Sequence, residues 1–151
     1  MSDRYLILIA EDPKFEPDEE QLELAREFLE ATVGEADETE VTHSGELEFF
    51  DCGGNFDEVK CPRCGRELFK DWWQEQLDVA FRGESIQLKK LTMPCCDGRA
   101  TLHELRYDMP QGFGSFSIQA MNPEIDDLDE DVKCELEQIV GTKLRVIWQR
   151  I

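Results

Sequence analysis

Two pairs of cysteines, separated by thirty residues, constrain this sequence more than any other feature. The first pair lies in the run Cys61-Pro62-Arg63-Cys64-Gly65, and the second lies in the run Pro94-Cys95-Cys96-Asp97-Gly98. A Cys-x-x-Cys turn followed by glycine aims two thiolates at one point while its backbone amides turn toward the sulfurs. The spacing therefore predicts one zinc ion, bound by Cys61, Cys64, Cys95 and Cys96.

The second pair is less regular than the first. Adjacent cysteines in an extended chain point to opposite sides, so Cys95 and Cys96 reach one metal only where the chain turns sharply. Pro94 and the dipeptide Asp97-Gly98 favour such a turn. Four protein ligands leave no position for water, so we expect a structural zinc site and not a catalytic one.

Other readings of the cysteines stay open at this point. Cys52 and His103 are rival candidates for the fourth ligand. A redox-active pair at Cys61 and Cys64, or buried thiols without a metal, would also account for the first motif. A strained disulfide between the two adjacent cysteines is a further alternative.

The chain has 151 residues, which is the size of one domain with room for a small inserted segment. We see no secretory signal, and the longest apolar run, residues 5–10, is too short to cross a bilayer. Six cysteines without a signal peptide indicate a reducing compartment and metal binding in preference to disulfides. We therefore expect a single domain over residues 1–151, located in the cytoplasm.

The formal net charge of -19 is distributed unevenly. Residues 53–106 carry nine acidic and nine basic side chains and sum to zero, whereas the flanks carry 26 acidic and seven basic side chains. Nucleic-acid binding needs a basic surface, which neither part offers, and we expect no membrane contact either. The charge fits a basic protein partner, although a purely solubilising surface is the plainer interpretation.

Hydrophobic patterning predicts strands and helices on both sides of the cysteine segment. Apolar runs and alternation predict strands over residues 4–10, 46–52, 86–93, 113–120 and 143–149. Stripes of apolar residues predict a helix that begins near Pro17 and ends at Gly34, and a helix over residues 67–82 that is buried on more than one side. A third helix, ending at Val140, follows a predicted capping box of Asp127 and Glu130.

A repeated motif suggests the fold. Ala10-Glu11-Asp12-Pro13 is similar to Ala120-Met121-Asn122-Pro123, and each follows a strand and precedes an acidic helix ending in Val-Gly. Two strand-helix-strand halves predict an α+β fold with the ferredoxin-like, or split βαβ, arrangement, in which the strands over residues 4–10 and 113–120 are central neighbours. Residues 53–106 are then a zinc-binding insertion, resembling a zinc ribbon or knuckle, between the two halves.

Nearly the whole chain resembles a family of short, uncharacterised bacterial proteins often labelled "sugar ABC transporter ATPase". The matching motifs are Asp51-Cys52-Gly53-Gly54-Asn55-Phe56, Cys61-Pro62-Arg63-Cys64-Gly65, Trp72-Trp73, Pro94-Cys95-Cys96, Leu105-Arg106-Tyr107-Asp108 with Pro110 and Gly112-Phe113, and Asn122-Pro123. The resemblance implies kinship but no activity. The ATPase label is unsupported, because the sequence has no glycine-rich loop ending in Gly-Lys-Ser/Thr to hold phosphates.

No catalytic motif stands out in the sequence, so we predict no enzymatic activity and no catalytic residues. Tyr107-Asp108 and Asp51-Cys52 are the loop residues best suited to line a cleft, and structural roles are favoured for both. We expect a zinc-stabilised, acidic interaction module, immunity-like or regulatory, whose helices cover a basic partner. The alternatives are an enzyme of unknown reaction and a thiol or metal redox sensor.

Overall fold

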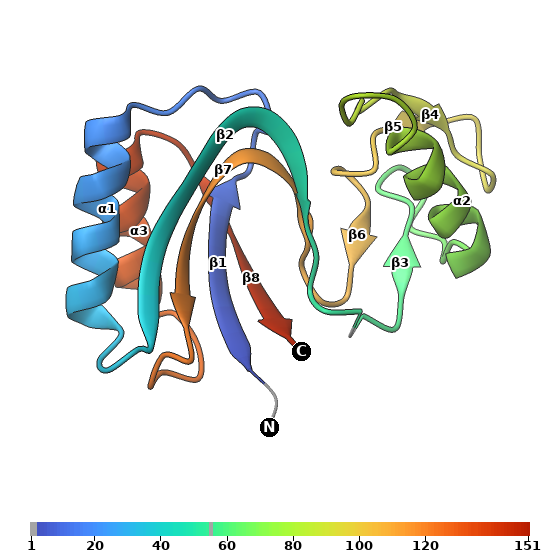
Figure 1. The fold of residues 1–151 in the computed structure, drawn as a ribbon. Helices are drawn as coiled ribbons and strands as arrows, with labels where there is room; N and C mark the ends of the chain where they lie inside the picture. Colours follow the sequence, from blue (N-terminus) through green and yellow to red (C-terminus); the bar gives the residue numbers. More distant parts are fainter. Residues whose placement is uncertain (1–2, 55) are drawn as a thin grey trace.

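The computed structural model of the protein describes residues 3–54 and 56–151, so Asn55 of the Asp51–Phe56 motif and the first two residues lie outside it. The described chain is a mixed α/β structure with three helices and a mostly antiparallel arrangement of strands. It has two parts (Figure 1). We call residues 3–51 and 112–151 the sheet lobe and residues 56–109 the cysteine lobe.

The sheet lobe is built on a four-stranded antiparallel sheet with the strand order β2-β7-β1-β8. β1 and β7 are neighbours at its centre, as the repeated motif predicted. Both are buried along most of their length, which agrees with their apolar sequences. The strands are β1 (Arg4–Ala10), β2 (Glu38–Phe50), β7 (Gly112–Met121) and β8 (Leu144–Arg150).

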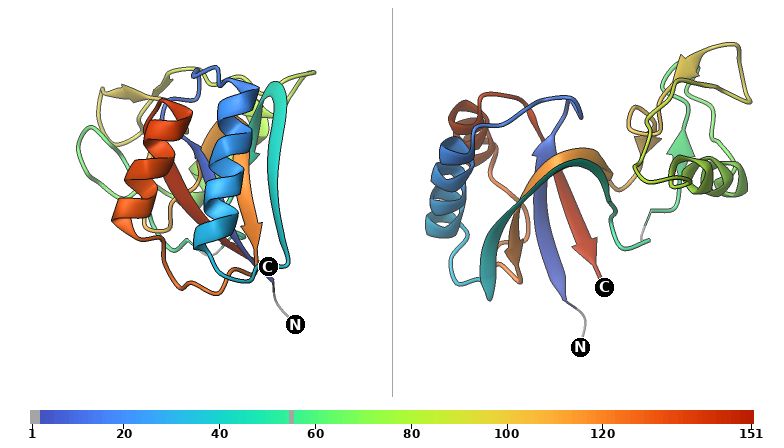
Figure 2. Two further views of the ribbon diagram at one scale, coloured as in Figure 1. Left: turned by 90° about the vertical axis from the view of Figure 1, so that its left-hand side faces the viewer. Right: turned by 45° about the horizontal axis from the view of Figure 1, so that its top comes forward.

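Helices α1 (Glu19–Thr32) and α3 (Glu130–Val140) lie side by side on one face of this sheet (Figure 2). Their apolar stripes face the sheet and form a core with the inward side chains of the strands. Its fully buried helical members are Leu22, Ala25, Leu29, Leu136 and Val140. None of the helices in the described residues is long and apolar enough to span a membrane.

The start of α3 differs from the predicted capping box of Asp127 and Glu130. Asp129 is the N-cap, and its carboxylate accepts a hydrogen bond from the backbone N–H of Asp131. The Asp127 carboxylate instead accepts the N–H of the next residue, Leu128, at 2.8 Å. Several aspartates in succession offer the same capping chemistry, so the sequence pattern alone did not select the right one.

β2 begins earlier than the predicted residue 46, because residues 38–43 also pair with β7. β2 is an edge strand, and acidic side chains facing solvent protect such an edge from pairing with another chain. The pairing register shifts between His43 and Glu48, where Gly45 has a φ of 79°. This irregularity bends the β2–β7 ribbon toward the cysteine lobe (Figure 1).

Short strands form the cysteine lobe, which lies on the side of the sheet away from α1 and α3 (Figure 1). β3 (Val59–Lys60) pairs with β6 (Arg106–Tyr107), and β4 (Leu91–Thr92) pairs with β5 (Arg99–Ala100). The strand predicted over residues 86–93 is therefore wrong for all but two residues. β5 offers only two residues for pairing, and this limits the length of β4.

α2 (Lys70–Ala80) is shorter than the predicted helix over residues 67–82. Trp73, Leu77 and Ala80 pack into the core of the cysteine lobe. The prediction of burial on more than one side is wrong, since Phe69 is 81% and Val79 is 49% exposed. The wide apolar band of the helix reflects exposed apolar residues and not a second packing surface.

Candidate metal centre

The structure brings Cys61, Cys64, Cys95 and Cys96 together, with all four sulfur atoms within 4.8 Å of one another. The Sγ atoms of Cys61 and Cys96 are 3.9 Å apart, and those of Cys64 and Cys95 are 3.2 Å apart. Cys61 is buried, Cys64 is exposed, and the adjacent pair is half-buried. The site thus lies near the surface but is anchored in the core through Cys61.

A tight hairpin holds the first two cysteines. Lys60 and Glu67 form a β-bridge at its base, and the N–H of Cys61 donates to the carbonyl of Arg66 at 2.9 Å. Inside the turn, the N–H of Arg63 points at the Cys61 sulfur at 3.4 Å. Gly65 closes the turn with a φ of 78°, a conformation that glycine adopts without strain. This is the geometry that the Cys-x-x-Cys-Gly motif predicted.

A second hairpin holds the adjacent cysteines. β4 and β5 form its arms, and the N–H of Met93 donates to the carbonyl of Gly98 at 2.9 Å across its base. The N–H of Gly98 points at the Cys96 sulfur at 3.4 Å, which repeats the amide-to-sulfur contact of the first hairpin. The sharp turn predicted between Pro94 and Gly98 therefore exists, and it lets both adjacent thiols face the same point.

The two hairpins touch closely at Arg63 and Gly98. A Cβ atom placed on Gly98 would lie 2.7 Å from Arg63 Cγ and 2.8 Å from Arg63 Cβ, so only glycine fits there. Arg63 also crosses to the second hairpin, where its Nε donates to the carbonyl of Arg99 at 2.9 Å and its guanidinium binds Glu104 at 3.0 Å. Steric contact and hydrogen bonds together fix the relative position of the two cysteine pairs.

Glu104 joins this brace to a second cation. Its carboxylate binds Lys90 at 2.7 Å and accepts the N–H of Thr101 at 3.0 Å. The hydrogen bond from Lys90, together with those contacts, lowers the pKa of Glu104 to about 2. The carboxylate therefore stays ionised, and its ion pair with Arg63 persists throughout the physiological pH range.

The donor set fits a metal ion. Tetrahedral coordination with metal–sulfur bonds of about 2.3 Å places the sulfurs about 3.8 Å apart, close to the separations seen here. A disulfide would need about 2.05 Å, and the six cysteines are free thiols. These four cysteines could therefore hold one metal ion with no coordination position left for water.

The thiols of Cys61 and Cys95 differ in pKa. Burial tends to raise the pKa of Cys61, but hydrogen bonds from the backbone of Cys64 and Arg63 and from neighbouring thiols lower it to about 7. Burial and the thiols of Cys64 and Cys61 raise the pKa of Cys95 to about 12. The Cys61 thiol therefore ionises readily, and its negative charge opposes the ionisation of Cys95. A bound cation would relieve this repulsion, since metal ligation favours thiolates.

The rival ligands lie elsewhere. Cys52 is fully buried, and its thiol donates to the amide oxygen of Gln111 at 3.4 Å. His103 is 3% exposed and uses both ring nitrogens, with Nε2 2.7 Å from the carbonyl oxygen of Glu11 and Nδ1 2.9 Å from the N–H of Phe113. Neither side chain belongs to the cysteine cluster.

The loop residues considered as cleft candidates have structural contacts. The carboxylate of Asp108 accepts the N–H groups of Asp57 and Glu58 at 3.0 Å, which ties β6 to the start of β3. The Tyr107 hydroxyl donates to the carbonyl of Leu102 and accepts from the indole N–H of Trp73. Asp51 caps its own turn by accepting the N–H of Gly53 at 2.7 Å. Each of these contacts stabilises the local conformation of the chain.

A polar network between the lobes was not predicted. Arg145 on β8 binds the carboxylate of Glu11 and donates to the carbonyls of His103 and Gln111 at 3.1 and 2.8 Å. Burial tends to raise the pKa of Glu11, but the hydrogen bonds from Arg145 lower it below its ordinary value. The partners are 34, 42 and 134 residues from Arg145 in the sequence, so no local pattern could have indicated them.

Comparison with protein-family models, with curated proteins and with solved structures gave no match for this chain. The family resemblance drawn from the sequence motifs therefore stays a prediction. A fold does not define a function, which resides in the site and the surface of the protein.

Proposed function

We propose that this protein is a zinc-stabilised acidic interaction module with a ferredoxin-like sheet lobe. The antiparallel strand order β2-β7-β1-β8 with two helices on one face supports the ferredoxin-like assignment. The two strand-helix-strand halves are β1-α1-β2 and β7-α3-β8. Their first strands, β1 and β7, are neighbours at the centre of the sheet. The cysteine lobe is then the insertion between the halves, as expected for residues 53–106.

Zinc is the metal that the donor set favours. Four thiolates in a tetrahedral arrangement are typical of structural zinc, whereas calcium and magnesium require oxygen ligands. The small β-strands of the cysteine lobe contribute little hydrogen bonding, so the ion would supply much of the free energy that keeps the two hairpins together. The absence of an open coordination position supports a structural role.

The observation that carries the proposed function is the acidic face formed by α1 and α3. The two helices lie side by side, and the segments 16–40 and 124–137 that contain them hold nineteen acidic residues against Arg26 and Lys133. Arg26 is already engaged, since its guanidinium binds Glu23 at 2.5 Å and Glu30 at 2.7 Å. Carboxylates far outnumber cations in these two segments, and such a surface attracts a basic protein and repels nucleic acid and anionic membranes.

An interface also needs an apolar contact, because exposed ion pairs contribute only about 0–1 kcal/mol each. The adjacent Trp72 and Trp73 of α2 are large apolar side chains, but Trp72 is partly buried against the core of the cysteine lobe. Trp73 is buried, but Leu24 is 56% exposed and lies on α1 among its acidic residues. We therefore assign the apolar anchor of the acidic face to Leu24.

An acidic, cytoplasmic, bacterial protein of this kind would act as an immunity-like or regulatory protein that covers the basic surface of its target. The test is to isolate the bound protein from the source organism and to measure its association rate with this chain at rising salt. A Debye length falling to about 8 Å at physiological strength should slow association markedly. Replacing Glu23, Glu27 and Glu30 by glutamine should slow it at low salt as well.

A matched control removes three exposed charges elsewhere, at Asp71, Glu75 and Asp78 on α2. This control should leave the association rate nearly unchanged, while Leu24→Ala should speed dissociation. An association rate that is insensitive to salt and to the α1 substitutions would leave the charge as a solubilising surface.

A second candidate function is redox sensing by the cysteine cluster. The supporting observation is the 3.2 Å separation of the Cys64 and Cys95 sulfurs, with Cys64 exposed. Peroxide would take two electrons from this pair, forming one disulfide and water and releasing the metal. Metal that leaves on mild peroxide treatment and returns after reduction would favour this function, and metal that stays bound would exclude it.

A further inference from the structure

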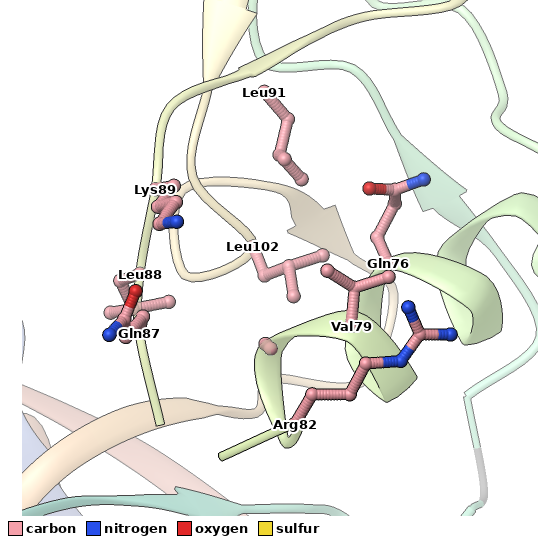
Figure 3. Close-up of a pocket in the computed structure, with 9 residues that line it drawn as sticks. Gln76, Val79, Arg82, Gln87, Leu88, Lys89, Leu91 and Leu102 are labelled. Atoms are coloured by element: carbon pink, nitrogen blue, oxygen red, sulfur yellow. The ribbon is translucent and has the colours of Figure 1, made fainter. Parts of the chain in front are cut away.

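The cysteine lobe contains a pocket of about 270 Å³ between the C-terminal part of α2 and the extended segment that leads into β4. Figure 3 shows Leu102 at its centre, between Val79 of α2 on one side and Leu88 and Lys89 of the extended segment on the other. The pocket lies outside the cysteine cluster and away from the acidic face of α1 and α3. We propose that it binds a short-chain aliphatic carboxylate.

The volume and the apolar lining of the pocket determine the length and the chemical character of the ligand's tail. Its floor is formed by buried Leu102 and Ala80, and its walls include half-buried Leu88 and Leu91. At about 30 Å³ for each water, the space corresponds to roughly nine water molecules. An unbranched tail of about six to eight carbons matches that space and would cover apolar surface that now faces solvent.

Charged side chains at the rim of the pocket determine which head group the ligand can carry. Arg82, just beyond α2, and Lys89, on the extended segment, both line the pocket. Neither side chain makes an ion pair or a side-chain hydrogen bond with any residue that the structure describes. Arg63, Lys90 and Arg145, by contrast, each bind a carboxylate. Figure 3 shows Arg82 and Lys89 on opposite sides of Leu102, so an acidic head can bind at either cation, and guanidinium binds it through paired hydrogen bonds.

Arg82 and Lys89 are two of several cations without an ion pair in the described part of a chain with a net charge of -19. Thirty-five acidic side chains are available, yet none reaches Arg82 or Lys89 among the described residues. The overall field of the protein disfavours anions and favours cations at any nonspecific site. A preference for an anionic amphiphile over a cationic one of equal length is therefore diagnostic of this pocket.

The experiment is a titration of the full, metal-loaded chain with octanoate, octylamine and octanol, followed by ¹H–¹⁵N NMR. We expect one octanoate per chain with a millimolar or lower dissociation constant, as for a small ligand of ten non-hydrogen atoms. Shifted amide signals should cluster at the end of α2 and at residues 87–91. Octanol should bind roughly tenfold more weakly, because it lacks the charged hydrogen bonds, and octylamine should bind more weakly still.

Three variants locate the site without disturbing the core. Arg82→Glu should weaken octanoate binding at least tenfold, and Val79→Trp should block the pocket from its exposed rim. Arg106→Glu changes the charge equally at an exposed position of the same lobe outside the pocket, and should leave binding within about twofold. Equal weakening by Arg106→Glu and Arg82→Glu, unchanged binding in Val79→Trp, or octylamine binding as tightly as octanoate would each overturn the proposal. So would the absence of octanoate binding at 10 mM, roughly ten times the expected constant.

Discussion

The imidazole of His103 in the cysteine lobe is hydrogen-bonded to the backbone of Glu11 in the sheet lobe, with Nε2 2.7 Å from the carbonyl oxygen. Its Nδ1 accepts the N–H of Phe113 at 2.9 Å, so Nε2 carries the proton and donates it to Glu11. Both nitrogens of a neutral ring are therefore used to join the lobes. The ring is buried, and it is not available to a metal.

This relationship predicts the effect of His103→Ala. The substitution removes two buried hydrogen bonds and leaves a buried N–H without a partner, which should cost about 2–4 kcal/mol of unfolding free energy. Chemical denaturation measures that loss, with His43→Ala on the half-buried edge strand as the matched control. Metal content should stay unchanged, and a loss of metal from folded protein would show that His103 is a ligand after all.

The same residue predicts a dependence of stability on pH. Burial, together with the nearby Arg145 charge, lowers the pKa of His103 below its ordinary value. Below about pH 6.5 the unfolded chain therefore binds a proton that the folded chain does not, and the folded state loses stability as pH falls. The destabilisation caused by His103→Ala should then be larger at pH 7.5 than at pH 5.5. Equal values at both pH values would contradict the lowered pKa.

Metal analysis should find about one zinc per chain, and Cys96→Ala should abolish it. Cys52→Ala and the exposed Cys134→Ala are controls that should keep the full amount, since neither cysteine is in the cluster. Zinc removal by a chelator should unfold the cysteine lobe first. Amide exchange in β4 and β5 should rise while β1 and β7 stay protected. Full metal in Cys96→Ala would refute the proposed ligand set.

Gly98→Ala should disturb the site without removing a ligand. The added methyl would overlap the Cβ and Cγ atoms of Arg63, which lie close to the backbone and cannot move freely. We expect the hairpins to be pushed apart at a cost of about 1–3 kcal/mol, seen as faster zinc transfer to a chromophoric chelator. Combining it with Arg63→Gly removes the overlapping atoms and should recover part of the loss. No recovery in the double variant would place the strain elsewhere.

Asp108→Asn tests the link between β6 and β3. The carboxylate accepts the N–H groups of Asp57 and Glu58, and those hydrogen bonds hold the pKa of Asp108 below its ordinary value. An amide offers one acceptor oxygen and no charge, so we expect a loss of about 1 kcal/mol. Urea denaturation measures it, with exposed Asp97→Asn as the control. A stability equal to that of the unchanged protein would show that the Asp108 carboxylate does not stabilise the link between β6 and β3.

The sequence by itself determined the features that depend on neighbouring residues. The Cys-Pro-Arg-Cys-Gly turn, the turn between Pro94 and Gly98, and the apolar stripes of α1 and α3 follow from local chemistry, and the structure contains them as predicted. The repeat at Ala10 and Ala120 also placed β1 beside β7. These features are encoded within a few residues of chain.

Tertiary contact decided the rest. β2 extends back to Glu38 because β7 offers it partners, while β4 stops after two residues because β5 does not. The choice among cysteines was settled by position, since Cys52 packs against Gln111 within the core while Cys96 lies in the hairpin whose Gly98 contacts Arg63. The Glu11–Arg145–His103 network joins segments up to 134 residues apart. Hydrogen bonding and steric fit between such distant segments leave no periodic trace in the sequence, so only the folded chain reveals them.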